Sequence, residues 1–210
     1  GFDPSIFHID NLAGLKIRSK FHLKGKVFGF FGRLIYEKGA HILVAALEYL
    51  KNYEWTMVMD EFSIYKNAYC SEIKKLITEA GLLDRIVYIN PTHSEMGDYL
   101  NAVDLVVMPS ISTSVWEEQY GRIAAEAMAC GKPVVASKSG AIPMLLGGYG
   151  TLFPEGDVDM LRKILRAFLT NGFCQNAVCA EEMSEYAHNN LSIDNQKDLM
   201  KSVFQHTSSD

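Results

Sequence analysis

The sequence predicts an α/β fold: a doubly wound parallel sheet of about six strands with helices on both faces. From Lys26 onward, short runs rich in β-branched and aromatic residues alternate with stretches of helical period, and that alternation is typical of parallel sheets covered by helices. Several of the runs are apolar throughout, as expected for strands buried on both faces. A chain of 210 residues, 48% of them hydrophobic, fits one such domain.

The expected strands are the β-rich runs themselves, at 27–32, 55–59, 86–89, 105–108, 133–136 and 151–153. Between them, apolar residues recur at helical spacing and predict helices around 42–50, 73–80, 94–102 and 158–168, with two more closing the chain. Thr92 is the expected cap of the third helix, and Gly81 is placed to end the second.

Composition excludes several classes of function. The formal net charge of -5 is spread over residues of both signs, which argues against a nucleic-acid partner. The four cysteines, at 70, 130, 174 and 179, form no zinc-binding pattern, so we expect no metal and reduced, mostly buried thiols. No apolar run is long enough to span a bilayer and no signal-like segment opens the chain, so a cytoplasmic location is expected.

The ends of the chain differ from the rest. The opening GFDPSIF carries turn chemistry and does not fit the helix-strand rhythm. We therefore expect residues 1–20 to be an inter-domain connector, 21–205 to be the folded domain and 206–210 to be a flexible tail.

The turn after the first predicted strand carries the first candidate site. Gly32 leaves room for close approach of a ligand, and Arg33 and Lys38 place two cations near a helix N-terminus. Arginine grips phosphate oxygens in a fork and lysine acts as a point charge, so the pair suits a pyrophosphate. The alternative is that both are solvated loop charges. A dinucleotide oxidoreductase is disfavoured because no G-x-G-x-x-G fingerprint is present.

The second candidate segment runs from Pro109 to Pro133. A polar loop is followed by a small-residue helix that is expected to start near Gly121 and end at Gly131, with its N-terminus in the crevice, where it favours a phosphate. Glu118 and Glu126 lie eight residues apart in this segment, and carboxylates accept hydrogen bonds from the vicinal hydroxyls of sugars. Solvated or capping glutamates are the alternative interpretation.

Together these residues resemble the retaining glycosyltransferases of the two-domain GT-B architecture, related to glycogen synthase and to the group 1 family. The resemblance covers essentially the whole chain. It rests on four ordered motifs and on the linker-like opening GFDPSIF; the motifs are FGRLIYEKG (31–39), DLVVMPS (104–110), the E-x7-E pair 118–126 within EEQYGRIAAEAMACGKPVVAS, and SGAIP (139–143).

The resemblance implies a Rossmann-like C-terminal domain that binds a nucleotide-sugar donor such as a UDP- or GDP-hexose, without a metal or cofactor. Arg33 and Lys38 would neutralise the leaving diphosphate, and Glu118 would contact the transferred sugar. Glu126 would bind the ribose. The backbone of Gln119, Tyr120 and Gly121 would line the pocket with Gly32, and backbone groups near Asn90 and Ser110 would recognise the base. Arg33, Lys38 and Glu118 would thus be the catalytic residues.

Family members also have an N-terminal acceptor-binding domain, and we expect that it is missing from this sequence. The resemblance therefore implies a donor-binding part that is inactive alone, with possible peripheral membrane association of the full-length enzyme. The histidines at 8, 22, 41, 93, 188 and 206 match no catalytic motif and are expected to be structural or at the surface.

Two departures from the family pattern stand out: Met59-Asp60-Glu61-Phe62-Ser63 replaces a Gly-rich turn, and Met144 replaces a glutamate. Two other functions stay open. One is a stand-alone nucleotide-sugar-binding subunit of a split enzyme, and the other is a nucleotide-sugar epimerase, which shares the GT-B layout.

Overall fold

A six-stranded parallel sheet forms the centre of the part of the chain that the computed structural model describes, residues 1–60, 67–171, 179–195 and 197. Its order is β3-β2-β1-β4-β5-β6. The strands are β1 (Lys26–Phe30), β2 (Trp55–Asp60), β3 (Ile86–Ile89), β4 (Leu105–Met108), β5 (Val134–Ser137) and β6 (Thr151–Phe153). The order reverses between β1 and β4, so the predicted doubly wound sheet is confirmed. In such a sheet the ligand crevice lies beyond the carboxyl ends of the strands at this reversal.

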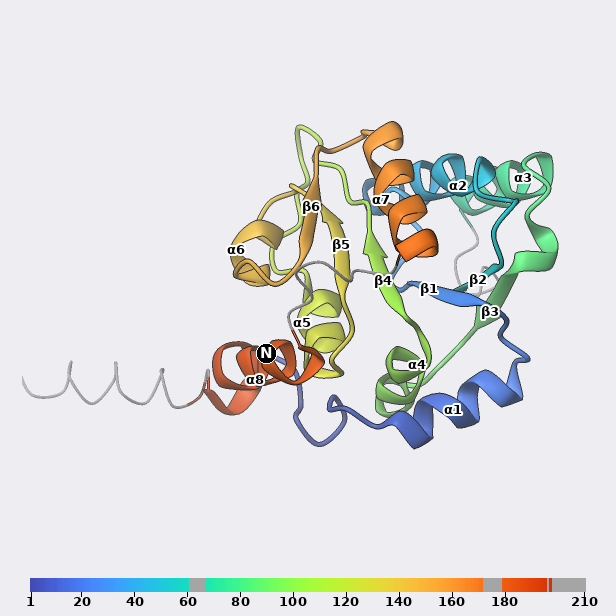
Figure 1. The fold of residues 1–210 in the computed structure, drawn as a ribbon. Coiled ribbons are helices and arrows are strands. Elements are labelled where there is room, and N and C mark those ends of the chain that lie inside the picture. Colours follow the sequence, from blue (N-terminus) through green and yellow to red (C-terminus); the bar gives the residue numbers. More distant parts are fainter. Residues whose placement is uncertain (61–66, 172–178, 196, 198–210) are drawn as a thin grey trace, which may run out of the picture.

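Helices cover both faces of the sheet (Figure 1). One face carries α2 (Ala40–Glu48), α3 (Ala68–Glu79) and α7 (Val158–Asn171). The other carries α1 (Asn11–Lys20), α4 (Met96–Ala102), α5 (Arg122–Ala129), the short α6 (Ile142–Leu146) and α8 (Ala180–Leu191). Neighbouring strand residues alternate between the two layers, as in Val27 and Phe28, because successive side chains point to opposite faces.

Three strands, β3, β4 and β6, have the predicted bounds, and β2 runs one residue further than predicted, to Asp60. β1 and β5 differ from the predicted bounds at both ends. β1 ends at Phe30 instead of Gly32 because Gly32 adopts a φ of 123° that no strand residue has. β5 begins at Val134, since Pro133 has no N–H and contributes only its carbonyl, which accepts from Val106 at 3.0 Å.

The two residues predicted to end one helix and to cap another, Gly81 and Thr92, have these roles in the structure. Gly81 follows the end of α3 with a φ of 66°, and Thr92 forms a capping box with Glu95. The predicted helix at 94–102 is split into a 3-10 turn, η3 (His93–Glu95), and α4. α8 is one of the two predicted closing helices, and most of the chain beyond it, including the predicted tail at 206–210, lies outside the described residues.

The first twenty residues, predicted as a connector, pack on the domain and contain a helix that the sequence did not indicate. Phe2 and Phe7 are buried, and the Asp10 carboxylate caps α1 by accepting from the Ala13 N–H at 2.9 Å. Gly14 brings α1 so close to α4 that a methyl group there would overlap the carbonyl oxygen of Asn101. The helix shows no apolar stripe because it buries only two small residues, Ala13 and Gly14.

The cysteine prediction holds in part. Cys70 and Cys130 are free and buried, whereas Cys179 is free and exposed; Cys174 lies outside the described residues. Within those residues, no group of three or more His, Cys, Asp or Glu side chains is placed to hold a metal ion. Nor does any helix among them have the length and apolarity needed to cross a membrane.

Candidate functional site

A cavity of about 630 Å³ opens at the carboxyl edge of the sheet, between the turn after β1, the loop after β3 and the segment after β4. It gathers residues that are far apart in the sequence. Nine of the ten predicted site residues line it: Gly32, Arg33, Lys38, Asn90, Glu118, Gln119, Tyr120, Gly121 and Glu126. The tenth, Ser110, is buried behind Glu118 and donates to that carboxylate at 3.3 Å.

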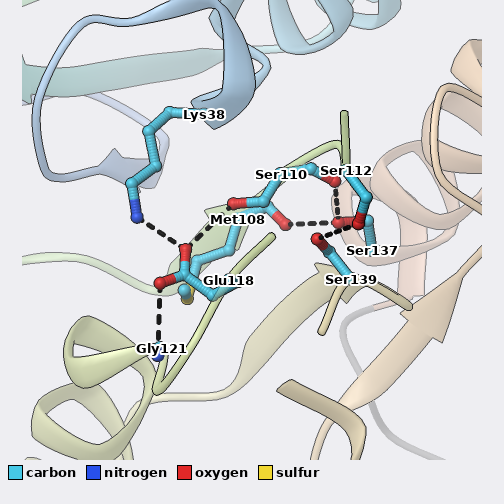
Figure 2. A network of polar contacts seen from close by, with 8 residues as sticks. All are labelled: Lys38, Met108, Ser110, Ser112, Glu118, Gly121, Ser137 and Ser139. Atoms are coloured by element: carbon cyan, nitrogen blue, oxygen red, sulfur yellow. Dashed lines mark hydrogen bonds and ion pairs between the residues drawn. The ribbon is translucent and has the colours of Figure 1, made fainter. Parts of the chain in front are cut away.

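An ion pair joins the two predicted segments across the crevice (Figure 2). Lys38 ends the 3-10 turn η1 (Tyr36–Lys38), and its Nζ lies 2.6 Å from Oε2 of Glu118. The other oxygen, Oε1, accepts from the N–H of Gly121 at 3.3 Å, just before α5. Lys38 also lies over the ring of Trp116, 5.5 Å from its centroid. The lysine and the carboxylate are therefore held in place before any ligand arrives.

Two glycines fix the backbone beneath this ion pair. Gly39, with a φ of 69°, passes so close to the end of β4 that a methyl group there would overlap the carbonyl oxygen of Pro109. Gly140, with a φ of 50°, approaches the carbonyl of Glu118 equally closely, and that carbonyl accepts from Ala141 at 2.8 Å. The loops that carry Lys38 and Glu118 are thus packed against neighbouring backbone.

The cavity is open beside Gly32. Its φ is 123°, and a methyl group added there would have no heavy atom within 4 Å. The next residue, Arg33, is exposed at the cavity wall. Opposite, α5 begins at Arg122 with Gly121 as its cap. Because the N-terminus of a helix carries partial positive charge, this end of the cavity favours an anion.

Glu126 places a carboxyl group in a buried position at the cavity. It lies in α5 and is only 3% exposed, yet it lines the cavity, and its buried Oε1 has no hydrogen-bond partner among the described residues. Burial raises its pKa to about 7, while the Arg122 guanidinium acts to lower it. Buried acceptors are normally satisfied, so this oxygen is suited to a donor supplied by a ligand.

Glu126→Gln is expected to stabilise the ligand-free protein at alkaline pH. The pKa is raised from 4.5 to about 7 by folding, so the folded state binds the proton more tightly than the unfolded state does. The neutral Glu126 carboxyl group therefore contributes free energy of folding that is fully present below pH 4.5 and is lost as the pH rises through 7. In urea unfolding we therefore expect Gln to add about 3 kcal/mol at pH 8.5 and little at pH 4.5.

Glu185→Gln, on the exposed side of α8 and away from the ends of that helix, is the matched control for that measurement, and we expect it to change stability little at either pH. A loss of stability in Glu126→Gln at pH 8.5 would show that the carboxylate is satisfied in the folded state.

Several cavity residues were missed by the sequence interpretation. His93, expected to be structural or at the surface, lines the cavity in the 3-10 turn after β3, with its ring centroid 5.6 Å from that of Phe7. Its position beyond the end of a strand, close to Asn90, was the available signal. The others are Phe31, Pro91, Met96, Met108, Arg122 and Ile123.

Two other histidines have the expected structural contacts. His41 stacks on Tyr36 with centroids 4.9 Å apart, and His188 packs edge-on against Phe2; His206 lies outside the described residues. Of the two departures from the family pattern, Met144 is 81% exposed, and residues 61–63 of the other lie outside the described residues.

The chain is similar in sequence to known glycosyltransferases. The family model described as "Glycosyl transferases group 1" matches residues 15–190. A D-inositol 3-phosphate glycosyltransferase of Mycobacterium marinum is 34% identical over 119 residues, which cover 55% of this chain and 24% of that protein. The lipopolysaccharide core biosynthesis mannosyltransferase LpsB of Rhizobium meliloti is 31% identical over 151 residues, 69% of this chain and 41% of that protein.

Solved structures have the same fold. HepE from Anabaena, in complex with UDP and glucose, superimposes with a TM-score of 0.81 at 27% identity, covering 97% of this chain and 55% of that chain. The C-terminal domain of LpcC, a glycosyl transferase group 1 family protein from Francisella tularensis, has a TM-score of 0.75 at 24% identity, covering 92% of this chain and 100% of that one. The chain therefore spans about half the length of HepE and less than half of the two curated relatives.

Proposed function

Because the chain belongs to the glycosyl transferases group 1 family, we propose that it binds the nucleotide-sugar donor of a retaining GT-B glycosyltransferase. The observation that carries the proposal is the meeting of two features in one cavity. One is the Lys38–Glu118 pair at 2.6 Å, and the other is the buried Oε1 of Glu126, which has no hydrogen-bond partner among the described residues. A nucleoside diphosphate sugar supplies a partner for each.

The diphosphate would lie between the turn after β1 and the start of α5. Arg33 and Lys38 would donate to its oxygens, in the open space beside Gly32. The N-terminus of α5 would add its partial charge from the other side. Since the bond to the sugar breaks with negative charge growing on the leaving phosphate, these groups would stabilise the transition state more than the bound donor.

The two carboxylates would hold the two sugars. Glu126 would accept hydrogen bonds from the ribose hydroxyls at its buried Oε1, for which the described part of the chain offers no hydrogen-bond partner. Glu118, held by Lys38 and Gly121, would contact the transferred hexose where that sugar joins the phosphate. In the proposed reaction the bond from the anomeric carbon to phosphate breaks and a bond to an acceptor oxygen forms. The acceptor's proton passes to the leaving phosphate, on the same face of the sugar.

A uridine nucleotide is the first donor to test. Two solved structures of HepE, which is 27% identical to this chain and similar in fold, contain bound ligands. One is described in complex with UDP and glucose and the other with UDP-glucose. We propose that Asn90, after β3, and the backbone near Ser110, after β4, recognise the base. The acceptor would bind to an N-terminal domain outside this chain. A cytoplasmic location and peripheral association of the full-length enzyme with a membrane belong to the same proposal.

Calorimetric titration of the chain with UDP, GDP, ADP and their sugars tests this function. We expect one nucleotide series to bind, and Arg33→Ala with Lys38→Ala to abolish that binding while circular dichroism shows a folded chain. We also expect the wild type to prefer the ribonucleotide over its 2′-deoxy form, a preference that Glu126→Gln removes. Failure of every nucleotide to bind, with the acceptor domain supplied as well as without it, would overturn the proposal.

A further inference from the structure

Arg122 occupies a position from which it can control the buried carboxylate of the site. It is the first residue of α5, one helical turn before Glu126. Its Nε lies 3.3 Å from Oε1 of Glu126, while the arginine side chain is 69% exposed and the glutamate side chain 3% exposed. Both residues line the cavity. One partner of this pair is thus exposed to solvent and the other is buried in the cavity wall.

The charge of Glu126 depends on this contact. Burial disfavours the ionised carboxylate and raises its pKa to about 7, whereas the Arg122 guanidinium and the amino group of Gly1 act in the opposite direction. Lys38 and Glu118 face the same cavity but are paired with each other. The Cys130 thiol, in the residue that caps the C-terminus of α5, stays neutral because burial raises its pKa to about 12. Arg122 therefore acts against the effect of burial and favours the ionised carboxylate.

The geometry of the Arg122–Glu126 pair leaves the carboxylate available to accept a hydrogen bond from a ligand. Although Nε is 3.3 Å away, Oε1 has no hydrogen-bond partner among the described residues. The guanidinium therefore contributes charge without occupying the acceptor position. An ionised carboxylate accepts at both oxygens, whereas a protonated one gives up part of that capacity to its own O–H.

We propose that Arg122 is a positioning residue that keeps the Glu126 carboxylate charged and turned toward the cavity. Charged in this way, the carboxylate can accept hydrogen bonds from two hydroxyls of a ribose diol, an inference that rests on the proposed function. Arg122 acts through Glu126 and does not hold the nucleotide itself. It was absent from the residues that the motif indicated, because its role depends on a neighbour one turn away.

The first test follows the Glu126 carboxyl carbon by ¹³C NMR during a pH titration of the ligand-free chain. Arg122→Met is expected to raise the titration midpoint by about one pH unit, since an opposite charge at this distance is lost. Arg122→Lys should restore most of the difference. Arg166→Met, which removes an exposed arginine from α7, is the matched control, and the Gly1 amine is common to all variants. An unchanged midpoint in Arg122→Met would overturn the inference.

The second test measures UDP affinity at pH 7 and at pH 9. With the midpoint moved from about 7 to about 8, the ionised fraction at pH 7 falls about fivefold, so Arg122→Met should bind UDP about fivefold more weakly there and nearly normally at pH 9. It should have no further effect in a Glu126→Gln background. An equal loss at both pH values would show that Arg122 contacts the phosphates directly, which contradicts the inference.

The two tests separate the inference from the function on which it rests. Absence of UDP binding in the wild type would count against the proposed function and against the diol as ligand, whereas the NMR midpoint decides by itself whether Arg122 controls the carboxylate.

Discussion

Lys38→Ala is expected to lower the affinity for a nucleoside diphosphate by at least about 30-fold, or about 2 kcal/mol. Part of this loss is the missing contact between the ammonium and the phosphate. The rest arises because Glu118, whose side chain is only 10% exposed, would keep its charge with its 2.6 Å partner removed. A diphosphate entering the cavity would then meet an uncompensated carboxylate.

The uncompensated charge of Glu118 can be removed by a second substitution. Adding Glu118→Gln to Lys38→Ala should recover part of the affinity for UDP, because the repulsion between the carboxylate and the diphosphate disappears. Lys163→Ala, which removes an exposed lysine from α7, is the matched control, and calorimetry should find wild-type affinity. A Lys38→Ala variant that binds UDP as tightly as the wild type would exclude Lys38 from the diphosphate site.

Gly39→Ala is expected to cost about 3 kcal/mol or more of folding free energy. A side chain at a φ of 69° is strained, and the added methyl group would also overlap the carbonyl oxygen of Pro109 at the end of β4. Relief requires the turn after β1 to move away from β4. Lys38 precedes Gly39 directly, so the variant should also lose nucleotide affinity.

Gly156→Ala separates the overlap from the strain. Its φ of 74° is nearly the same, but a methyl group there has no heavy atom within 4 Å. We expect about 1 kcal/mol for this variant, from strain alone. Urea unfolding of the two variants side by side measures the difference. Equal losses would mean that the approach of Gly39 to Pro109 is not tight in solution.

The parts of the fold that were predictable are those with a strong local pattern. β3, β4 and β6 are short runs whose ends coincide with a change in residue type, and their bounds were predicted correctly. α1 was missed because it packs through Ala13 and Gly14 and leaves Leu12 and Leu15 exposed, so no apolar stripe marks it. A helix that is held by close backbone approach has no periodic signal.

The motifs indicated residues that the fold brings to one place. Arg33, Lys38, Glu118 and Glu126 all line one cavity, although they come from two segments. The pairing of Lys38 with Glu118 could not be predicted, since it depends on Gly39 and Gly140 bringing three loops together. His93 and Arg122 were missed because no motif singles them out, and only the fold brings them to the cavity.

A crystal structure of the chain with bound UDP would test the central claim most directly. We expect the diphosphate within hydrogen-bond distance of Arg33 and Lys38. We also expect a ribose hydroxyl to donate to Oε1 of Glu126, the oxygen that has no such partner in the described part of the ligand-free chain. UDP bound outside this cavity, or bound within it with the ribose turned away from Glu126, would show that the proposed donor site is wrong.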